Sequence, residues 1–385
     1  MTGKEKIQAA FAPAGTPEIP VMICYEDIYI RDHWAQLTPE PWWTKHTPDL
    51  QARHQLLREI AGKIGQDIFR APTFYSRAER EALTTEVRSG QVYLVNRKTG
   101  EEKLLAAPQV GGWAPGGESQ SVHAEQLPAT RAEIDRLIPE ALPFDCRQFL
   151  AEGHGDLAAQ LHNTMGRAKA ALYHVSSPFW QCYYLWGFEG LMILAADRPE
   201  LVEYACRRWL SHTLTILHLA KALGTELIWI EECLADMLSP EAFAKLSAPW
   251  ASALTHEIHS LGMHSIYYFC GNPAGKWEAI LATGADALAL EESKKGFAID
   301  IVDVARRVNG RAVLLGNLDA IGVLQNGTEQ ELRSEISRQV AAGRRNGSRF
   351  IMSIGSPVTP ETPVERVRLY CDLVHDLGSN TGRRA

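Results

Sequence analysis

Short apolar runs alternate along the chain with longer amphipathic stretches. The runs are rich in valine, isoleucine, leucine and aromatic residues, and several are apolar at consecutive positions. Such continuity is typical of strands that helices cover on both faces. We count eight runs, at 20–25, 66–70, 171–175, 226–232, 264–270, 286–291, 312–317 and 349–355. Eight strands with helices between them predict an α/β protein with a single (β/α)8 barrel of the TIM type, spanning 1–385.

The amphipathic stretches carry recognisable helix ends. The stretch 197–224 has Pro199 in its first turn and ends at Gly224, which predicts one long helix. The stretch 239–262 starts at Ser239 as N-cap and is predicted as one helix with a kink at Pro249. Thr328 and Glu331 have the spacing of a capping box.

The connection between the second and third strands is far longer than the others. Two alternating runs surround a Lys-Thr-Gly turn within 89–106, which predicts a β-hairpin, and a Gly/Pro-rich loop at 108–119 leads to short helices. A connection after a barrel strand emerges at the carboxyl-end face, where active sites lie. The segment 72–165 is therefore predicted to be an insertion that forms a lid, with surface decoration as the alternative.

Charge and composition exclude several classes of function. The formal net charge is −7 and no stripe of lysine and arginine is present, which argues against nucleic-acid binding. The N-terminus lacks the apolar core of a secretory signal, and no stretch is apolar enough for a transmembrane helix, so we expect a cytoplasmic protein with no membrane partner. The seven cysteines show no C-x-x-C spacing, so neither a disulfide framework nor a zinc ribbon is indicated.

Polar residues gather where the predicted strands end, which is where a barrel binds and transforms its substrate. The paired carboxyls Glu231 and Glu232 end a strongly apolar strand, so at least one is expected to be functional. Cys270, beside Gly271, is expected at the mouth rather than in the core. The full set is Tyr25, Glu26, Asp27, His174, Glu231, Glu232, Tyr268, Cys270, Glu291, Glu292, Asn317 and Asp319.

Several of these candidates have a structural alternative. His174 sits in an apolar run and could be a hydrogen-bonded core histidine. Glu26 and Asp27 could be solvated loop residues or a helix cap, and Asn317 and Asp319 could only organise their loop. Tryptophans predicted near the mouth or the lid would suit an apolar methoxylated ring or serve packing alone; they are Trp34, Trp42, Trp43, Trp113 and Trp180.

Four ordered motifs of the last 120 residues carry a family likeness: "YFCGN", "ATGADALALEES", "LLGNLDAIGVLQNGTEQEL" and "IGSPVTPETPVERV". In order and spacing they resemble the uroporphyrinogen decarboxylase superfamily. That resemblance implies a single (β/α)8 barrel. The superfamily includes porphyrinogen decarboxylases and methyltransferases that use corrinoid proteins.

Three departures separate the chain from the decarboxylases. These enzymes carry an arginine-rich segment where this chain has "CYEDIYIRDHW", a catalytic aspartate where it reads "IFRAPTF", and a histidine where it has Ser356. No other basic set replaces them, although the substrate of a decarboxylase carries many carboxylates.

The methyltransferase branch implies zinc bound by His-x-Cys after the fifth strand. Cys270 matches the first cysteine of that set and Glu291 its acidic position, while Tyr268 replaces the histidine and Ser356 stands near the second cysteine. The stretches "EESKKGFAIDI" and "GNLD" are similar to those of methyl ether demethylases. That likeness suggests a second metal set, Glu118, Glu133 and His154, although Glu133 could instead close a capping box with Thr130.

The resemblance therefore implies a corrinoid-dependent methyltransferase of the O-demethylase type. It would move a methyl group from a small methoxylated donor, such as an aryl methyl ether, to the cob(I)alamin of a separate corrinoid protein. A decarboxylase-type carbon-carbon lyase and a non-catalytic ligand-binding paralogue are the alternatives. Zinc and a homodimer are left open. The expected catalytic residues are Glu231, Glu232, Tyr268 and His174, the substrate-binding residues Tyr25, Glu26, Asp27, Trp180, Asn317 and Asp319, and the metal ligands Cys270 and Glu291.

Overall fold

The computed structural model describes residues 1–112, 122–293 and 296–380, and its centre is a curled parallel sheet. The seven strands follow the order β1-β5-β6-β7-β8-β9-β10, and their apolar residues are almost all buried. Seven of the eight predicted runs are thus confirmed as strands. Their bounds are β1 Ile68–Arg70, β5 Ala170–Ser176, β6 Leu227–Glu232, β7 His264–Phe269, β8 Ala287–Leu290, β9 Val313–Leu315 and β10 Phe350–Ile351.

The remaining run, 20–25, lies between β10 and β1 but forms only one parallel bridge, from Val21 to Met352. On its other side the Val21 carbonyl accepts a hydrogen bond from the Asp67 amide at 2.8 Å. Side chains replace the rest of the ladder, because Asp67 Oδ2 accepts from the Val21 amide and Gln66 Oε1 accepts from the Ile23 amide. The segment therefore occupies the first strand position of a TIM-type barrel, without regular strand pairing.

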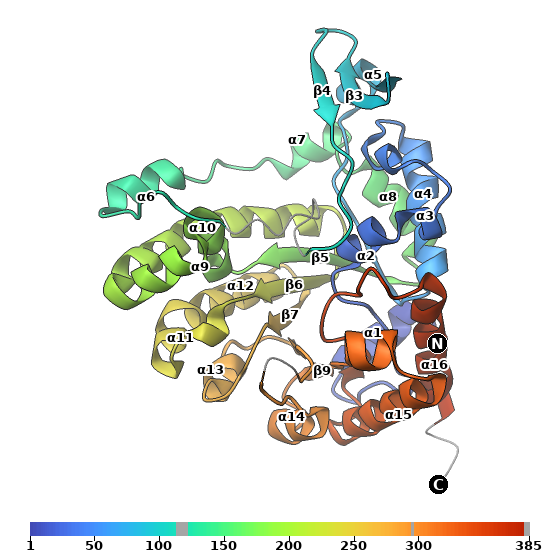
Figure 1. The fold of residues 1–385 in the computed structure, drawn as a ribbon, viewed down its shortest axis with the longest axis vertical. Helices are drawn as coiled ribbons and strands as arrows, with labels where there is room; N and C mark the ends of the chain where they lie inside the picture. The colour runs from blue at the N-terminus through green and yellow to red at the C-terminus, as the bar shows by residue number, and fades with distance from the viewer. Residues whose placement is uncertain (113–121, 294–295, 381–385) are drawn as a thin grey trace.

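Helices surround the sheet, as Figure 1 shows. The capping box of Thr328 and Glu331 is confirmed at the start of α15. The helices of the barrel and its N-terminal segment are α1 Gly3–Phe11, α2 Glu26–Asp32, α3 Trp34–Leu37, η1 Trp42–His46, α4 Leu50–Ile64, α8 Asp156–Met165, α9 Pro178–Asp197, α10 Pro199–Ala222, η2 Ala235–Met237, α11 Pro240–Leu246, α12 Ala248–Ser260, α13 Trp277–Ala282, α14 Ile301–Val308, η3 Ala320–Gln325, α15 Glu329–Arg345 and α16 Val364–Asn380.

The prediction of one kinked helix over 239–262 is wrong, because the chain forms α11 and α12 with a break at Ser247. Ser239 caps α11 as predicted, and Pro249 lies in the first turn of α12 rather than within a helix. A proline is tolerated in a first turn because its missing N–H would have no helical partner there. The break turns the Ser247 hydroxyl inward, where it meets a buried carboxyl described below.

The insertion after β1 contains a small antiparallel sheet that projects away from the barrel (Figure 1). The predicted hairpin is confirmed as β3 Gln91–Asn96 and β4 Glu102–Leu105, and a third strand, β2 Leu83–Arg88, which the pattern did not predict, pairs with β3. The short helices are α5 Arg77–Ala82, α6 Arg131–Leu137 and α7 Cys146–Ala151. Whether the segment 72–165 acts as a lid stays a prediction.

The two described ends of the loop after β4 are held by helices that follow barrel strands. The Gly111 amide donates to Asp32 Oδ1 at 3.0 Å, and Arg31 donates to the Gly112 carbonyl at 2.6 Å, both at the end of α2. On the other side, Val122 contacts α9 at Gly187 so closely that no side chain would fit there. These contacts tie the loop to α2 and α9, which follow the first and third strand positions.

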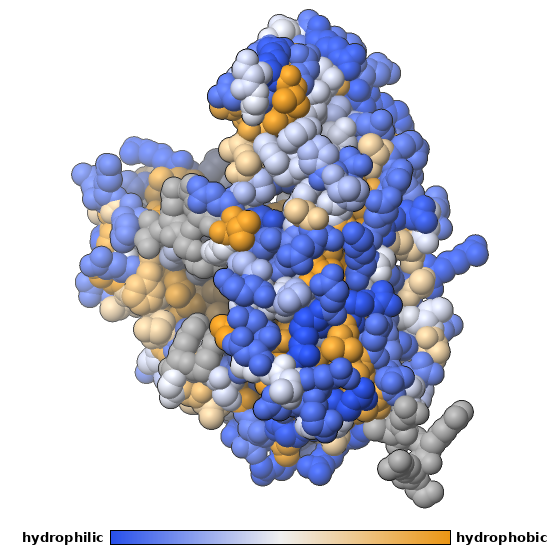
Figure 2. Space-filling model, turned by 45° about the vertical axis from the view of Figure 1, so that its right-hand side comes forward, coloured by the Kyte–Doolittle hydropathy of each residue, from blue (hydrophilic) through white to orange (hydrophobic). Residues whose placement is uncertain are grey.

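The outer surface is mainly polar on the face shown in Figure 2, with small separate hydrophobic areas. Among the described residues, no helix combines the length and apolar character that crossing a membrane requires.

Candidate functional site

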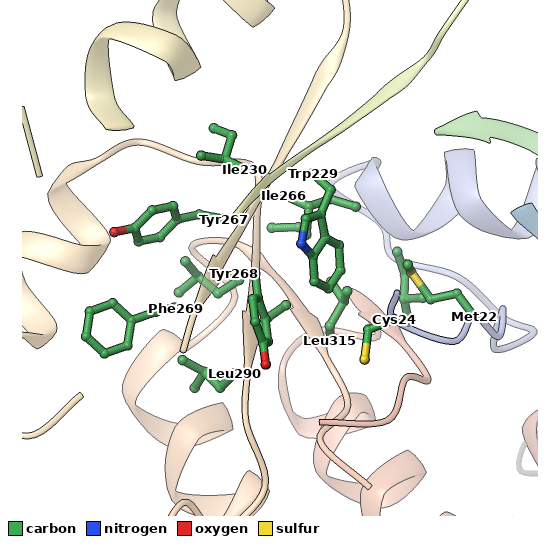
Figure 3. Close-up of a cluster of buried hydrophobic side chains, with 14 of the residues drawn as sticks. Met22, Cys24, Trp229, Ile230, Ile266, Tyr267, Tyr268, Phe269, Leu290 and Leu315 are labelled. Atoms are coloured by element: carbon green, nitrogen blue, oxygen red, sulfur yellow. The ribbon is translucent and has the colours of Figure 1, made fainter. Parts of the chain in front are cut away.

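Inward-facing side chains of β5, β6 and β7 form a stack of rings inside the barrel. The strand register pairs His174 with Trp229, and their rings stack at 5.5 Å and 11°. Trp229 in turn stacks on Tyr268 at 5.1 Å. Figure 3 shows Tyr268 and Trp229 on one side of β7 while Tyr267 and Phe269 point the other way, as strand alternation requires.

Tyr25 stands over these rings from the end of the first predicted strand. Its ring lies edge-on to His174, Trp229 and Tyr268, with centroids 5.7–6.2 Å away. Its backbone is left-handed, with φ 54°, at the start of α2. Such a conformation costs of order 1–3 kcal/mol for a residue other than glycine and is commonly kept at functional sites.

Glu231 is the carboxyl of this site, and the register places it beside Tyr268. Its Oε1 accepts a hydrogen bond of 2.8 Å from the Tyr25 hydroxyl, and Ser176 Oγ lies 3.4 Å from Oε2. Burial raises the pKa of Glu231, while the hydrogen bond from Tyr25 works in the opposite direction. Burial and the nearby Glu231 also raise the pKa of Tyr25 well above its usual value. The site therefore holds a proton near neutral pH more readily than a solvated carboxyl does.

Two thiols flank this carboxyl. Cys233 Sγ lies 3.8 Å from Glu231 Oε1, and Cys270, like Cys233, is only partly buried. A hydrogen bond with Cys270 and burial together raise the pKa of Cys233 well above its usual value, so this thiol stays protonated. Cys270 thus lies at the barrel mouth, where it was expected. Cys233 was not singled out, although its position directly after the Glu231–Glu232 pair could have indicated it.

Glu232 lies on the opposite face of β6, toward the helices. It is fully buried and accepts hydrogen bonds from Ser177 Oγ and Ser247 Oγ, both at 2.7 Å, with the Tyr267 hydroxyl at 3.3 Å. Burial raises its pKa to about 7, against the hydrogen bonds from the two serines. The two paired carboxyls therefore have different surroundings. Glu231 faces the mouth, whereas the hydrogen bonds of Glu232 connect β6 to Ser177 at the start of α9 and to Ser247 at the break between α11 and α12.

The carboxyls after β8 are held in the loops around them. Glu291 Oε2 accepts a hydrogen bond of 3.0 Å from the Gly271 amide, and Glu292 Oε2 accepts one of 2.8 Å from Ser356 Oγ. Gly271 has φ +95°, and a Cβ there would lie 2.2 Å from the Asp236 carboxyl, so only glycine permits this close approach.

The other residues predicted to bind substrate fall into two groups. Two of them hold local structure with their side chains, and two lie beside the mouth. Asn317 donates to the carbonyls of Glu291 and Ile299, and Asp319 caps η3, which favours the loop-organising alternative for both. Glu26, buried and bonded to Gln66, and Asp27, paired with Arg70, line a separate cavity of about 150 Å³. Burial raises the pKa of Glu26.

His174 is only partly buried by its exposed area although it lies inside the barrel. Burial of the imidazole, together with the positive charge of Arg70, lowers the pKa of His174 well below its usual value. The ring is therefore neutral at physiological pH. It contributes an aromatic surface and one hydrogen-bond acceptor to the site.

The tryptophans divide between the mouth and the periphery. Trp180 is buried in the first turn of α9 and stacks on Tyr183 at 4.7 Å, next to Tyr184. Trp34 donates from Nε1 to the Glu40 carbonyl, and Trp42 lies edge-on to Trp43 in η1. Trp113 lies outside the described residues.

A metal ion finds no ready ligand set in the described part of the chain. No group of three His, Cys, Asp or Glu side chains there is arranged to hold an ion, whether around Cys270 and Glu291 or around Glu133 and His154. Glu118, the third member of the second set, lies outside the described residues. Glu133 accepts from the Ala129 amide at 2.6 Å and its own amide donates to Thr130 Oγ1, so it serves a helix cap.

Comparisons with known proteins agree with the curled sheet and show the family of the chain. The family model of uroporphyrinogen decarboxylase (URO-D) matches residues 124–377, well over half of the chain. The chain belongs to this family. Curated relatives include the uroporphyrinogen decarboxylases of Coxiella burnetii (24% identical, 51% of this chain and 54% of theirs) and Prochlorococcus marinus strain MIT 9303 (23% identical, 60% and 65%). The chain thus spans only about half the length of the first curated relatives it matches.

A methyltransferase from Methanosarcina mazei shares the fold over nearly the whole length. The two structures superpose with a TM-score of 0.62, covering 98% of this chain and 99% of that one, at 18% sequence identity. At that identity the likeness establishes the fold, while the reaction has to be argued from the site.

Proposed function

We propose that this protein is a methyltransferase that takes a methyl group from a small methoxylated donor, such as an aryl methyl ether, and delivers it to the cob(I)alamin of a separate corrinoid protein. The observation that carries the proposal is one partly buried carboxyl, Glu231, held by Tyr25 among aromatic rings at the strand ends. Aromatic walls suit the ring of such a donor, and one protonatable group suits its oxygen.

The reaction needs an acid because an ether oxygen is a poor leaving group. The acceptor corrinoid supplies a strong nucleophile, and two of its cobalt electrons form the new bond to carbon. The oxygen leaves with the electron pair of the broken carbon–oxygen bond and takes a proton from Glu231, which water later restores. Burial favours the protonated form of Glu231 that this step requires.

The other residues of the mouth position the donor and exclude water. Trp229 and Tyr268, both buried, form a stacked aromatic layer next to the partly buried Tyr25, and Tyr25 fixes the orientation of the Glu231 carboxyl. Neutral His174 lies on the far side of Trp229 and extends the aromatic surface. Correct placement of the methyl group and the ether oxygen can account for a large part of the rate enhancement of methyl transfer, because it converts a bimolecular step into an effectively unimolecular one.

The curated relatives favour one competing function, carbon-carbon bond cleavage of the decarboxylase type. The mouth described above consists of carboxyls, thiols and rings, and Arg70, whose charge acts on His174, is paired with Asp27. A substrate with many carboxylates would lack cationic partners in this set. Turnover of a porphyrinogen by the purified protein would nevertheless establish the lyase in place of the methyltransferase.

The decisive experiment measures the oxidation state of the cobalt in the corrinoid protein by absorption spectroscopy. Purified protein, a corrinoid protein reduced to Co(I) and a panel of aryl methyl ethers should together give the absorption spectrum of methyl-Co(III). Free phenol should appear in equal amount. If neither change occurs with any donor and porphyrinogens are also left unchanged, a non-catalytic ligand-binding paralogue is the remaining interpretation.

Zinc at the mouth stays a prediction. The described donors do not fit it: Cys233 lies beside Cys270 and Glu231, yet no group of three His, Cys, Asp or Glu side chains in the described part of the chain is arranged to hold an ion. No step of the proposed reaction therefore runs through a metal. Metal analysis of protein purified without added zinc tests the prediction: zinc that is lost in Cys270→Ala or Glu291→Ala and kept in Glu133→Ala would establish a site at the mouth.

A further inference from the structure

A cavity of about 330 Å³ lies between helix α4, the 3-10 helix η1 and the loop that follows β1. Two cationic side chains line it, Lys45 from η1 and Arg53 from α4, together with the rings of Phe74 and Tyr75. Its size falls in the range of small-molecule sites, roughly 300–1,000 Å³. None of the rings or carboxyls of the barrel mouth contributes to it.

Neither cation has a partner among the residues that the structure describes. No hydrogen bond or ion pair joins the Lys45 ammonium or the Arg53 guanidinium to another described side chain. Arg53 also borders the 150 Å³ cavity, but Asp27 on that side is paired with Arg70. An unpaired guanidinium in a partly buried wall is costly, so such groups are normally paired or ligand-bound.

The carboxylate that lies at the rim is used elsewhere. Glu79 lines the same cavity, yet its Oε2 accepts a hydrogen bond of 2.7 Å from the Ser76 amide and closes the capping box of α5. His154, also on the wall, bonds through Nδ1 to the Phe74 carbonyl at 2.9 Å. These two side chains are therefore fixed in the wall and leave the cations free to meet a ligand.

The positive charge of this region affects its titrating neighbours. Burial, with Lys45, Arg53 and Lys103, lowers the pKa of His46 to about 4. Burial lowers the pKa of Arg53 to about 10, and burial with Arg53 and Arg31 lowers the pKa of Lys45. Repulsion of this kind is relieved when an anion enters.

We propose that Lys45 and Arg53 bind an oxyanion, the carboxylate or phosphate group of a small ligand, in the cavity between α4, η1 and the loop 72–75. The planar guanidinium of Arg53 can donate two parallel hydrogen bonds to such a group, and Lys45 adds a second charge. Tyr75 is held in the wall by its hydroxyl, which donates to the His46 carbonyl at 3.2 Å, and its ring offers an apolar surface beside the cations. This site does not depend on the proposed methyl transfer.

Isothermal titration of the full chain at low ionic strength, with inorganic phosphate and separately with benzoate, tests the site. Binding of either probe should weaken by about tenfold or more in Arg53→Gln and in Lys45→Gln, since each change removes a charge-assisted hydrogen bond. Arg58→Gln is the matched control, because Arg58 lies exposed on the same helix and should leave the affinity unchanged. Phosphate alone binding would assign a phosphate ligand, and benzoate alone a carboxylate.

Thermal unfolding gives a second readout that does not rely on one variant. A saturating probe should raise the Tm of the wild type and of Arg58→Gln, and that rise should be lost in Arg53→Gln and Lys45→Gln. The proposal is overturned if neither probe binds, or if the two variants bind and gain stability as the wild type does.

Discussion

Tyr25 and Glu231 meet across the barrel, where the tyrosine hydroxyl donates a hydrogen bond of 2.8 Å to Glu231 Oε1. Tyr25 directly precedes α2 and Glu231 is the last but one residue of β6, so the bond joins the first strand position to the middle of the sheet. It also fixes the carboxyl that the proposed reaction uses as its acid. The left-handed backbone of Tyr25 therefore matters for the proposed reaction, because Tyr25 holds the carboxyl that acts as the acid.

Replacing Glu231 with glutamine should abolish most of the methyl transfer. The amide keeps the shape and can still accept from Tyr25 but cannot give a proton to the leaving oxygen, so the rate should fall by roughly 10²–10⁴-fold. The initial rate of methyl-Co(III) formation measures this effect. Glu232→Gln is the matched control, because that side chain faces the helices and should keep a rate near the wild type where the protein is folded. Equal losses in both variants would contradict the assigned roles.

Replacing Tyr25 with phenylalanine should move the alkaline limb of the pH profile. The proposed reaction uses protonated Glu231, so its rate should fall as pH rises through the raised pKa of that carboxyl. The Tyr25 hydrogen bond lowers this pKa, and removing it should raise the pKa further and shift the falling limb of kcat to higher pH. A limb that stays in place, or moves to lower pH, would show that Glu231 is not the acid.

The strands of the barrel were predictable because burial on both faces leaves a continuous apolar run, and seven of eight runs are strands. The first run falls short because the side chains of Gln66 and Asp67 take ladder hydrogen bonds, which hydrophobicity does not reveal. Strand β2 was missed because its sequence, "LTTEVR", has no buried face to produce a pattern.

The sequence predicted which strand ends supply the candidate site residues, but not how their side chains are arranged. The paired carboxyls Glu231 and Glu232 were rightly expected to be costly, but the sequence could not say which one faces inward, because a shift of one residue exchanges the two faces. The hydrogen-bond partners of Glu232 are the hydroxyls of Ser177 and Ser247, and Ser247 reaches the carboxyl only because the helix breaks at that residue. Such contacts depend on tertiary packing and leave no local signal.

Glu232 should make the stability of the protein depend on pH. Its pKa of about 7 in the folded state lies above the ordinary value of 4.5, so the folded state binds the proton more tightly than the unfolded state. The free energy of unfolding should therefore fall by about 3 kcal/mol as pH rises from 4.5 to 7 and change no further above that.

Urea unfolding at a series of pH values, wild type against Glu232→Gln, measures this contribution. The difference between the two proteins isolates Glu232 from other carboxyls whose pKa values are also raised, such as those of Glu26 and Glu231. The hydroxyls of Ser177, Ser247 and Tyr267 are the groups that face this carboxyl in the wild type. The variant should gain stability relative to the wild type as pH rises from 4.5 to 7, and parallel curves would refute the assignment.

Gly187 should be the position at which the loop after β4 can be detached from α9. Its backbone has φ 66° and ψ −176° inside α9, a conformation open almost only to glycine, and a Cβ there would lie 1.6 Å from the Val122 carbonyl oxygen. Gly187→Ala should therefore combine backbone strain of about 1–3 kcal/mol with displacement of the chain at Val122.

Gly62→Ala is the matched control, because that glycine lies in helix α4 with nothing within 4 Å of its added Cβ and should keep or raise the stability. Limited proteolysis and thermal unfolding should show faster cleavage between β4 and α6 and a lower Tm in Gly187→Ala alone. If the segment 72–165 is a lid, KM for the methyl donor should also rise in that variant, whereas an unchanged KM with the same faster cleavage would favour surface decoration.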